Sequence, residues 1–198
     1  MLCRIAVAYA VTCTGVEISP YVCREAETKI QARGMTSRIS IMNMRGQDFA
    51  APEASFELVS CIGATWVWGG LSGTLKALTR WAKPGGLVAV GEPFWLKPPP
   101  ADYLAAQGFT NASFSTHEGN IAAGQREGLT PLLAIVSSQD DFDRYEGLTW
   151  LAAADFARDN PHDPDSVEIT TEIAKTRRTY LKWGRDHLGW AIYLYRKP

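Results

Sequence analysis

Lys83-Pro84-Gly85-Gly86-Leu87-Val88-Ala89-Val90-Gly91 is the stretch of the sequence that decides the fold. Pro84-Gly85-Gly86 predicts a tight turn, because proline and glycine favour turn conformations. The run that follows, 87–91, is apolar throughout, which predicts a strand covered on both faces, as in parallel sheets. A helix expected over 72–82 leads into this turn. Helix, turn and buried strand in this order are typical of an α/β domain.

The same alternation of strands and helices extends upstream. Ser19 suits a helix cap and Pro20 the first helical position, so a helix is expected from there to about Arg33, ending at Gly34. The other predicted elements are a helix over 2–10 and strands over 11–18, 38–42 and 56–63. Strands that alternate with helices predict a parallel sheet.

The second half of the sequence is less regular. An irregular stretch is expected over 110–128. The other predicted elements are a helix over 101–107, a strand over 132–136, a helix from Ser138 to about 158, a helix from Asp163 to about 187, and a strand over 190–195. The two long helices make residues 139–188 a helical insertion before the last strand.

Composition and charge narrow the class of protein. The chain has 198 residues, of which 46% are hydrophobic and 21% charged, with a formal net charge of -1. These values suit one globular domain spanning 1–198, and they point to neither a nucleic acid nor a membrane as a partner. The densest basic cluster, around Arg177 and Arg178, lies in a helix-like stretch rich in acids and is read as a solvated face.

Cysteine and histidine usage is also informative. The four cysteines, at 3, 13, 23 and 61, have no paired spacing, which predicts reduced thiols in a cytoplasmic protein. The three histidines lie far apart, so the sequence predicts no metal site.

Gly15-Val16-Glu17-Ile18-Ser19-Pro20 resembles the end of the second strand in class I S-adenosylmethionine-dependent methyltransferases, whose order of elements the chain shares. The resemblance implies a Rossmann-like sheet, mostly parallel with an antiparallel last strand and helices on both faces, and S-adenosylmethionine as cofactor. In the family an acid at this point accepts hydrogen bonds from the cofactor's ribose hydroxyls, a role that falls to Glu17, beside Ile18. A carboxylate can accept from two vicinal hydroxyls, and charged acceptors form the stronger hydrogen bonds.

The stretch 43–49 resembles the family loop that reads the adenine, and it makes Arg45 and Gly46 candidate cofactor contacts. Arg45 stands where the family often has an acid, yet a guanidinium cannot accept from the adenine amino group. Adenine recognition then falls to Asp48, Gln47 or a main-chain carbonyl.

Two further strand ends are candidate sites, because ligands of open α/β sheets lie at the carboxyl ends of the strands. Cys61, Ile62 and Gly63 end the central strand, where small residues let the chain approach the methionine part of the cofactor. Glu92 follows the next strand as a candidate catalytic base or substrate anchor. Its alternative role is to hydrogen-bond a helix terminus. Methyl transfer requires a base only where the nucleophile must lose a proton.

The candidate substrate contacts are aromatic side chains: Trp66, Trp68, Trp95 and Tyr145. Tryptophans more often pack in cores or lids than contact ligands. The insertion 139–188 stands where the family usually has a short hairpin, and its aromatic residues suit a lid over a small organic substrate. His117 is expected to be an exposed loop histidine.

One departure from the family stands out. Residues 2–10 resemble the later part of the family's first helix, so the first strand and the glycine-rich loop before it have no counterpart. The strands beside that position would then lose a partner, and their edges could promote a homodimer. A start site placed too late, an engineered or incompletely reported chain, or a shortened relative would each account for it.

Two functions of different classes follow. The first is S-adenosylmethionine-dependent methyl transfer to a nitrogen, oxygen or carbon of a small molecule. The second is a non-catalytic or cofactor-binding-impaired module that keeps the fold for binding or assembly. A nicotinamide-dependent oxidoreductase requires the same absent loop and ranks last.

Overall fold

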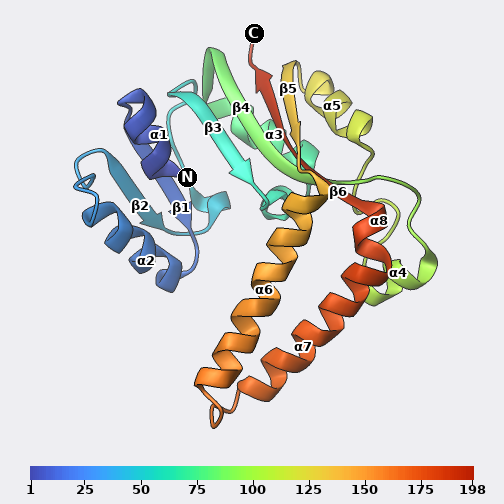
Figure 1. The fold of residues 1–198 in the computed structure, drawn as a ribbon. Coiled ribbons are helices and arrows are strands. Elements are labelled where there is room, and N and C mark those ends of the chain that lie inside the picture. Colours follow the sequence, from blue (N-terminus) through green and yellow to red (C-terminus); the bar gives the residue numbers. More distant parts are fainter. The chain divides into compact units, whose positions relative to one another are not determined.

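A computed structural model describes all 198 residues, and the chain divides into two compact units, Met1–Pro52 and Glu53–Pro198 (Figure 1). Each unit has its own sheet. None of the helices is both long and apolar enough to cross a membrane.

The first unit is a small parallel β-α-β arrangement preceded by a helix. Its elements are α1 (Leu2–Tyr9), β1 (Cys13–Glu17), α2 (Pro20–Gln31), β2 (Ile39–Asn43) and the 3-10 turn η1 (Gly46–Asp48). β1 and β2 run parallel, with Glu17 opposite Asn43 at their carboxyl ends. The predicted cap is present, since the Ser19 hydroxyl accepts from the backbone N–H of Val22. Ala6, Ile30, Met35 and Ile39 form the core.

The second unit contains a four-stranded sheet in the order β3-β4-β6-β5. The strands are β3 (Phe56–Ile62), β4 (Ala82–Trp95), β5 (Thr130–Val136) and β6 (Leu188–Arg196). β3 and β4 are parallel, whereas β6 runs antiparallel to both β4 and β5. The predicted antiparallel last strand is therefore confirmed. Within this chain β1 pairs only with β2, and β3 only with β4.

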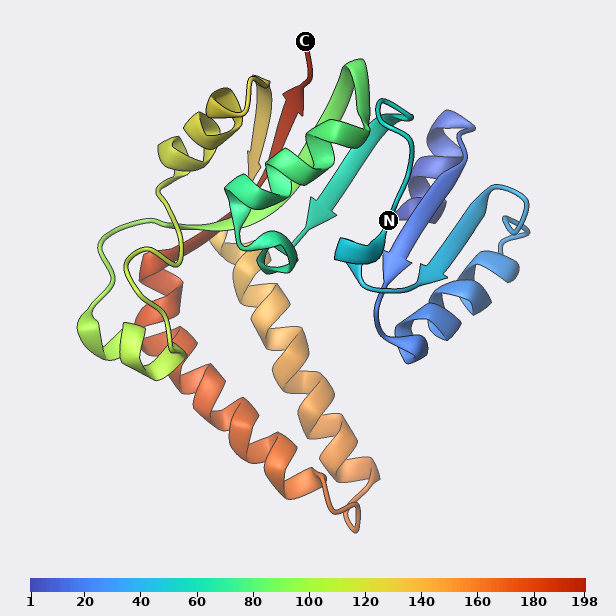
Figure 2. The same cartoon turned by 180° about the vertical axis from the view of Figure 1, so that it is seen from behind.

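Four short helical elements accompany this sheet: η2 (Thr65–Trp68), α3 (Leu71–Trp81), α4 (Ala101–Gln107) and α5 (His117–Arg126). α3 and α5 pack against β4, and Figure 2 shows α3 lying across the sheet. The side chains beneath them alternate along the two central strands, as the twofold period of a strand requires. They are Val88, Val90, Glu92 and Phe94 from β4 and Tyr193 and Tyr195 from β6, all buried.

The predicted helical insertion is confirmed as a long hairpin that extends away from the sheet (Figures 1 and 2). It consists of α6 (Gln139–Asp159), α7 (Ser166–Thr179), the π-helical turn η3 (Tyr180–Gly184) and α8 (Arg185–His187). Ser138 and Asp141 form a capping box at the start of α6, where each side chain accepts from the backbone N–H of the other residue.

The second unit differs from the sequence-based expectation at two places. The predicted Pro84-Gly85-Gly86 turn lies inside β4, where the pairing register with β3 shifts from Phe56–Ala82 to Leu58–Leu87. Gly85 has a φ of 75°, and its N–H donates to the carbonyl of Lys197 over 2.8 Å. The chain does turn here, but as an irregularity of a longer strand.

Residues 110–128, expected to be irregular, contain helix α5. Thr116 caps this helix by accepting from the N–H of Gly119. Two glycines within ten residues hide the helical pattern, since glycine is a poor helix former. Gly124 is needed there because a Cβ on it would lie 2.1 Å from the ring of Tyr195. Tertiary packing thus outweighs intrinsic propensity.

Candidate functional site

Glu17 is the last residue of β1, and only one of its two carboxylate oxygens accepts a hydrogen bond. Its Oε1 accepts from the backbone N–H of Ser19 over 2.8 Å, and no other hydrogen bond to this carboxylate is seen. The backbone carbonyl of Glu17 accepts from Asn43 Nδ2 and from the N–H of Met44, both over 3.0 Å. The main chain around Glu17 is therefore fixed, while one carboxylate oxygen remains available for a ligand.

The loop after β2 lies in the same unit as Glu17. Asn43 Nδ2 also donates to the carbonyl of Ile18 over 2.9 Å, which ties the two strand ends together. Arg45 is exposed and precedes the η1 turn that begins at Gly46. Asp48 closes that turn, with its N–H donating to the carbonyl of Arg45. Glu17 thus ends β1, and Ile18, Arg45 and Gly46 follow the carboxyl ends of the two paired parallel strands.

Cys61, Ile62 and Gly63 lie in the second unit, at the carboxyl end of β3. Cys61 is buried, and burial raises the pKa of its thiol. Gly63 has a φ of 74°, and its N–H donates to the carbonyl of Gly91 over 3.1 Å. This positive φ is the left-handed conformation that favours glycine. The bend at Gly63 directs the chain away from the sheet into η2.

Glu92 is the central acid of the second unit, with only 5% of its surface exposed. Its Oε2 accepts from the hydroxyl of Thr65 over 2.5 Å. The hydroxyl of Thr74, in α3, donates to the carbonyls of Thr65 and Gly70. Burial raises the pKa of Glu92, and the Thr65 hydrogen bond opposes that rise only in part. The arrangement suits an acid that holds its proton at higher pH than an exposed glutamate does.

A second cluster of polar side chains, not predicted from the sequence, lies on the same face of the sheet. Tyr193, buried on β6, accepts from Asn120 Nδ2 over 3.2 Å, and its hydroxyl lies 3.0 Å from His117 Nδ1. Asn120 Nδ2 also donates to the carbonyl of Pro93, next to Glu92. His117 begins helix α5 and is half-buried, so the expectation of an exposed loop histidine was wrong. The alternation along 190–195 places Tyr193 on the face of Tyr195, which is the signal that could have found it.

The predicted aromatic contacts occupy very different environments. Trp66 is 73% exposed and Tyr145 is 68% exposed, whereas Trp68 is half-buried. Trp95 is buried, and its Nε1 donates to the carbonyl of Asn111 over 3.1 Å. Its ring packs edge-on against Tyr103, Phe109 and Phe114. Trp95 therefore shapes an aromatic wall of the second unit, while Trp66 and Tyr145 present free ring surface.

Thr65 donates to Glu92, and burial first and then the charge of Glu92 raise the pKa of both the Cys61 thiol and the Tyr193 phenol. Cys61, Thr65 and Glu92 lie at or near the carboxyl ends of β3 and β4, and Tyr193 lies on β6 opposite Val90. In doubly wound α/β proteins ligands bind at this edge of the sheet. No group of three or more His, Cys, Asp or Glu side chains is placed to hold a metal ion.

Comparison with known proteins agrees with this geometry. A family model described as a methyltransferase domain matches residues 1–90. An uncharacterised Escherichia coli K12 protein, YjhP, is 29% identical over 195 residues, which cover 98% of this chain and 78% of YjhP. The X-ray structure of YjhP superposes with a TM-score of 0.90 at 27% identity, over all of this chain and 81% of that one.

Two solved structures carry a ligand. S-adenosylmethionine-dependent methyltransferases from Geobacter sulfurreducens and Thiobacillus denitrificans were each solved in complex with S-adenosylhomocysteine. They match with TM-scores of 0.90 and 0.89, both at 26% identity over all of this chain and 80% of theirs. The fold of the chain is that of class I S-adenosylmethionine-dependent methyltransferases, and these matches support a methyltransferase of that class. The predicted Rossmann-like α/β fold is confirmed by the same structures.

Proposed function

We propose that the chain binds S-adenosylmethionine with Glu17 as the acceptor for its ribose hydroxyls, and that it transfers the methyl group to a small molecule. The observation that supports this proposal is the carboxylate of Glu17, which has a hydrogen-bond partner on only one of its oxygens. One of its oxygens is fixed by the N–H of Ser19, which sets the orientation of the group, and the other is available for a hydroxyl. A carboxylate oriented before the ligand arrives loses less entropy on binding.

The other predicted cofactor contacts have separate parts in this proposal. Ile18 and the backbone of Gly46 follow strand ends of the first unit, where they suit contact with the ring systems of the cofactor. Arg45 has no acceptor to offer the adenine amino group, so the nearby main-chain carbonyls are the better candidates. Cys61, Ile62 and Gly63 remain candidates for the methionine part.

The bound cofactor supplies a methyl group on a sulfonium, an electrophile that needs alignment more than covalent help. The chain's own contribution is then orientation, exclusion of water and, where the acceptor carries a proton, a base. Glu92 is our candidate for that base, with Thr65 as the donor that orients its carboxyl group. An acid with a raised pKa is closer to the operating pH, which favours proton transfer.

A small organic substrate suits the helical hairpin better than a polymer does. The hairpin carries aromatic side chains that pack together, among them Phe142 and Trp150 from α6 and Tyr180 from η3. Long insertions between the strands of such folds commonly serve as lids or binding surfaces. We propose this role for 139–188.

Calorimetric titration with S-adenosylmethionine and S-adenosylhomocysteine tests the cofactor assignment. Glu17→Ala should weaken binding by about 10- to 100-fold, since hydrogen bonds to a charged group contribute about 1.5–3 kcal/mol. Glu27→Ala is the matched control, because Glu27 is an exposed acid of α2 in the same unit. Equal loss in both variants, or no binding by the folded wild-type chain, would contradict the proposal.

A further inference from the structure

One face of helix α6 carries Phe142, Glu146 and Trp150, spaced four residues apart and therefore stacked along the helix. Phe142 and Trp150 both pack edge-on against Tyr180, with ring centroids 5.7 and 6.1 Å apart. Glu146 is half-buried between these two positions. Burial is the main cause of the raised pKa of the Tyr180 and Tyr103 phenols, and the charge of Glu146 adds to it in both.

Two polar groups on this face lack the partners that buried groups normally have. Trp150 Nε1 is fully buried and makes no hydrogen bond. Glu146 makes no hydrogen bond or ion pair, and burial alone raises the pKa of its carboxyl group. An unpaired donor and an unpaired acceptor one helical turn apart are costly unless something else satisfies them.

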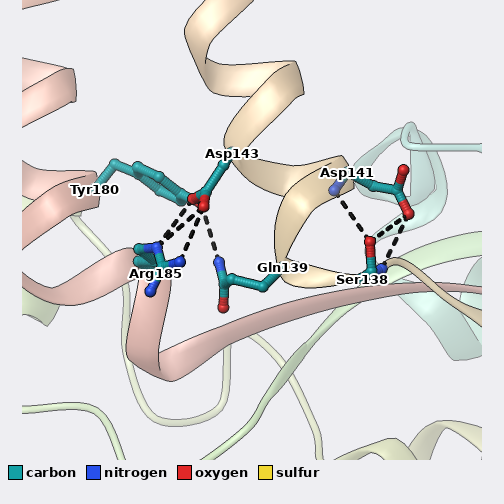
Figure 3. A network of polar contacts seen from close by, with 6 residues as sticks. All are labelled: Ser138, Gln139, Asp141, Asp143, Tyr180 and Arg185. Carbon is teal, nitrogen blue, oxygen red and sulfur yellow. Dashed lines mark hydrogen bonds and ion pairs between the residues drawn. The ribbon is translucent and has the colours of Figure 1, made fainter.

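The neighbouring acid shows the contrast (Figure 3). Asp143, one turn before Glu146, accepts from the Tyr180 hydroxyl over 2.6 Å and from Arg185 Nε and Nη2 over 3.0–3.1 Å. Arg185 is thus committed to Asp143 and is not available to Glu146. At the base of the hairpin Asp143 therefore has both hydrogen-bond donors and a cationic partner, whereas Glu146 has neither.

Tyr103 closes this region from helix α4. It is 2% exposed, its ring stacks on Trp183 with centroids 6.1 Å apart, and it lies against His187. Burial first, and then the charge of Glu146, raises the pKa of Tyr103 to about 12, so its hydroxyl stays protonated at neutral pH. The close approach of Gly184, where a Cβ would lie 3.2 Å from the Tyr103 hydroxyl, brings η3 against the same ring. We call Tyr103, Glu146, Trp150 and Tyr180 the hairpin-base site.

A carboxylate among aromatic rings is the chemistry that recognises an organic cation. The faces of tyrosine and tryptophan attract ammonium groups, and the attraction grows as water is excluded. A cation also offsets the cost of burying the Glu146 charge. A neutral or anionic ligand would leave that charge uncompensated.

We propose that the hairpin-base site binds an organic ammonium group and that the methyl acceptor of this enzyme is accordingly an amine-bearing small molecule. The second part of this inference rests on the proposed function, whereas ammonium binding does not. Glu146 is the counter-charge, Tyr103 and Tyr180 supply ring faces, and the Trp150 N–H offers a hydrogen bond to a polar group of the same ligand.

The test uses choline and its neutral isostere 3,3-dimethylbutan-1-ol as probes, with the full chain and no cofactor. The readout is the indole N–H signal of Trp150 in a nitrogen–proton correlation spectrum, assigned through Trp150→Phe. Choline should shift this signal saturably, and the neutral alcohol should bind at least about tenfold more weakly. Glu146→Gln should weaken choline by about tenfold, whereas Glu168→Gln, an exposed acid on α7, should leave it unchanged.

Three results would overturn the inference: no saturable shift with choline, equal binding of both probes, or full choline binding by Glu146→Gln. The Tyr180–Asp143 hydrogen bond, followed through the Tyr180 signals, reports that the hairpin base is still folded in each variant. Titration with S-adenosylhomocysteine is independent of these signals. Failure with choline while S-adenosylhomocysteine binds removes only this inference, and the reverse pattern removes only the proposed function.

Discussion

The hydroxyl of Thr65 donates to Glu92 Oε2 over 2.5 Å, and both residues are buried. Thr65 follows the carboxyl end of β3, and Glu92 lies near the carboxyl end of β4, so the bond links two strand ends that pair in parallel. The hydroxyl of Thr74 fixes Thr65 in turn by donating to its carbonyl. A buried acid with a single donor is sensitive to the loss of that donor.

Thr65→Val keeps the shape of the side chain and removes this donor. We expect the free energy of unfolding to fall by about 1–3 kcal/mol, the usual cost of leaving a buried polar group unpaired. The pKa of Glu92 should rise further, since the hydrogen bond now lowers it. Urea unfolding measures the first effect. Thr65→Ser keeps the hydroxyl and is the control, so an equal loss in both variants would show that the hydrogen bond is not the cause.

Glu92→Gln should change stability in a pH-dependent way. Burial raises the pKa of Glu92 above its ordinary value of 4.5, so the folded state holds this proton more tightly than the unfolded state. The contribution of this proton to the free energy of unfolding is fully present below about pH 4.5, and it is lost as pH rises through the raised pKa of Glu92. Glutamine resembles the protonated acid at every pH, so Glu92→Gln does not lose this stability as pH rises.

The two proteins should therefore unfold at similar temperatures near pH 4, while Glu92→Gln becomes the more stable one by pH 8. A difference of about 1 kcal/mol would appear as about 2–4 °C in a domain of this size. Thermal scans between pH 4 and 8 measure it. A difference that stays constant with pH, or a less stable variant at pH 8, would contradict the placement of Glu92.

Most of the fold could be predicted from local sequence signals. The Ser19-Pro20 cap, the apolar run 87–91 and the capping residue Ser138 each determine a structure within a few residues, and their elements form where expected. Helix α5 could not be predicted, because its glycines serve packing rather than helix formation. Gly124 is explained only by the ring of Tyr195, which lies 71 positions further along the sequence.

The candidate site was less predictable for a similar reason. Glu17 and Glu92 could be selected because each follows a strand-like run, and strand ends carry function in this class of fold. Asn120, His117 and Tyr193 assemble only through the packing of α5 on β6. From the sequence alone, Glu146 cannot be told from the other charged residues of an amphipathic helix, because its burial depends on the packing of the hairpin.

Gly124 and Gly147 should respond oppositely to alanine. A Cβ on Gly124 would lie 2.1 Å from Tyr195 Cε1, and Tyr195 is 1% exposed and cannot move freely. Gly124→Ala should therefore destabilise the chain by about 1–3 kcal/mol through overpacking. Gly147 lies within α6 with no atom near its Cβ position, so Gly147→Ala should stabilise by about 0.5–1 kcal/mol. Urea unfolding of the two variants decides this, and a shift in the same direction for both would contradict the packing of α5.

Asp143 links α6 to η3 and α8 at the base of the hairpin, since it accepts from both Tyr180 and Arg185 (Figure 3). These hydrogen bonds lower the pKa of Asp143, so the network should persist into mildly acidic solution. Asp143→Ala should remove the link and open the base of the hairpin. We expect faster hydrogen exchange of the backbone amides in η3 and α8, with no change in α3 or β4.

Asp140→Ala is the matched control for this measurement. Asp140 lies on the same turn of α6 and makes none of these bonds, so its removal should leave exchange in η3 unchanged. Exchange in Asp143→Ala that equals the wild type would mean that aromatic packing of Phe142 and Trp150 on Tyr180 holds the base without the carboxylate. Faster exchange confined to η3 and α8 would instead identify Asp143 as the residue that keeps α7 against α6, and with it the rings that surround Glu146.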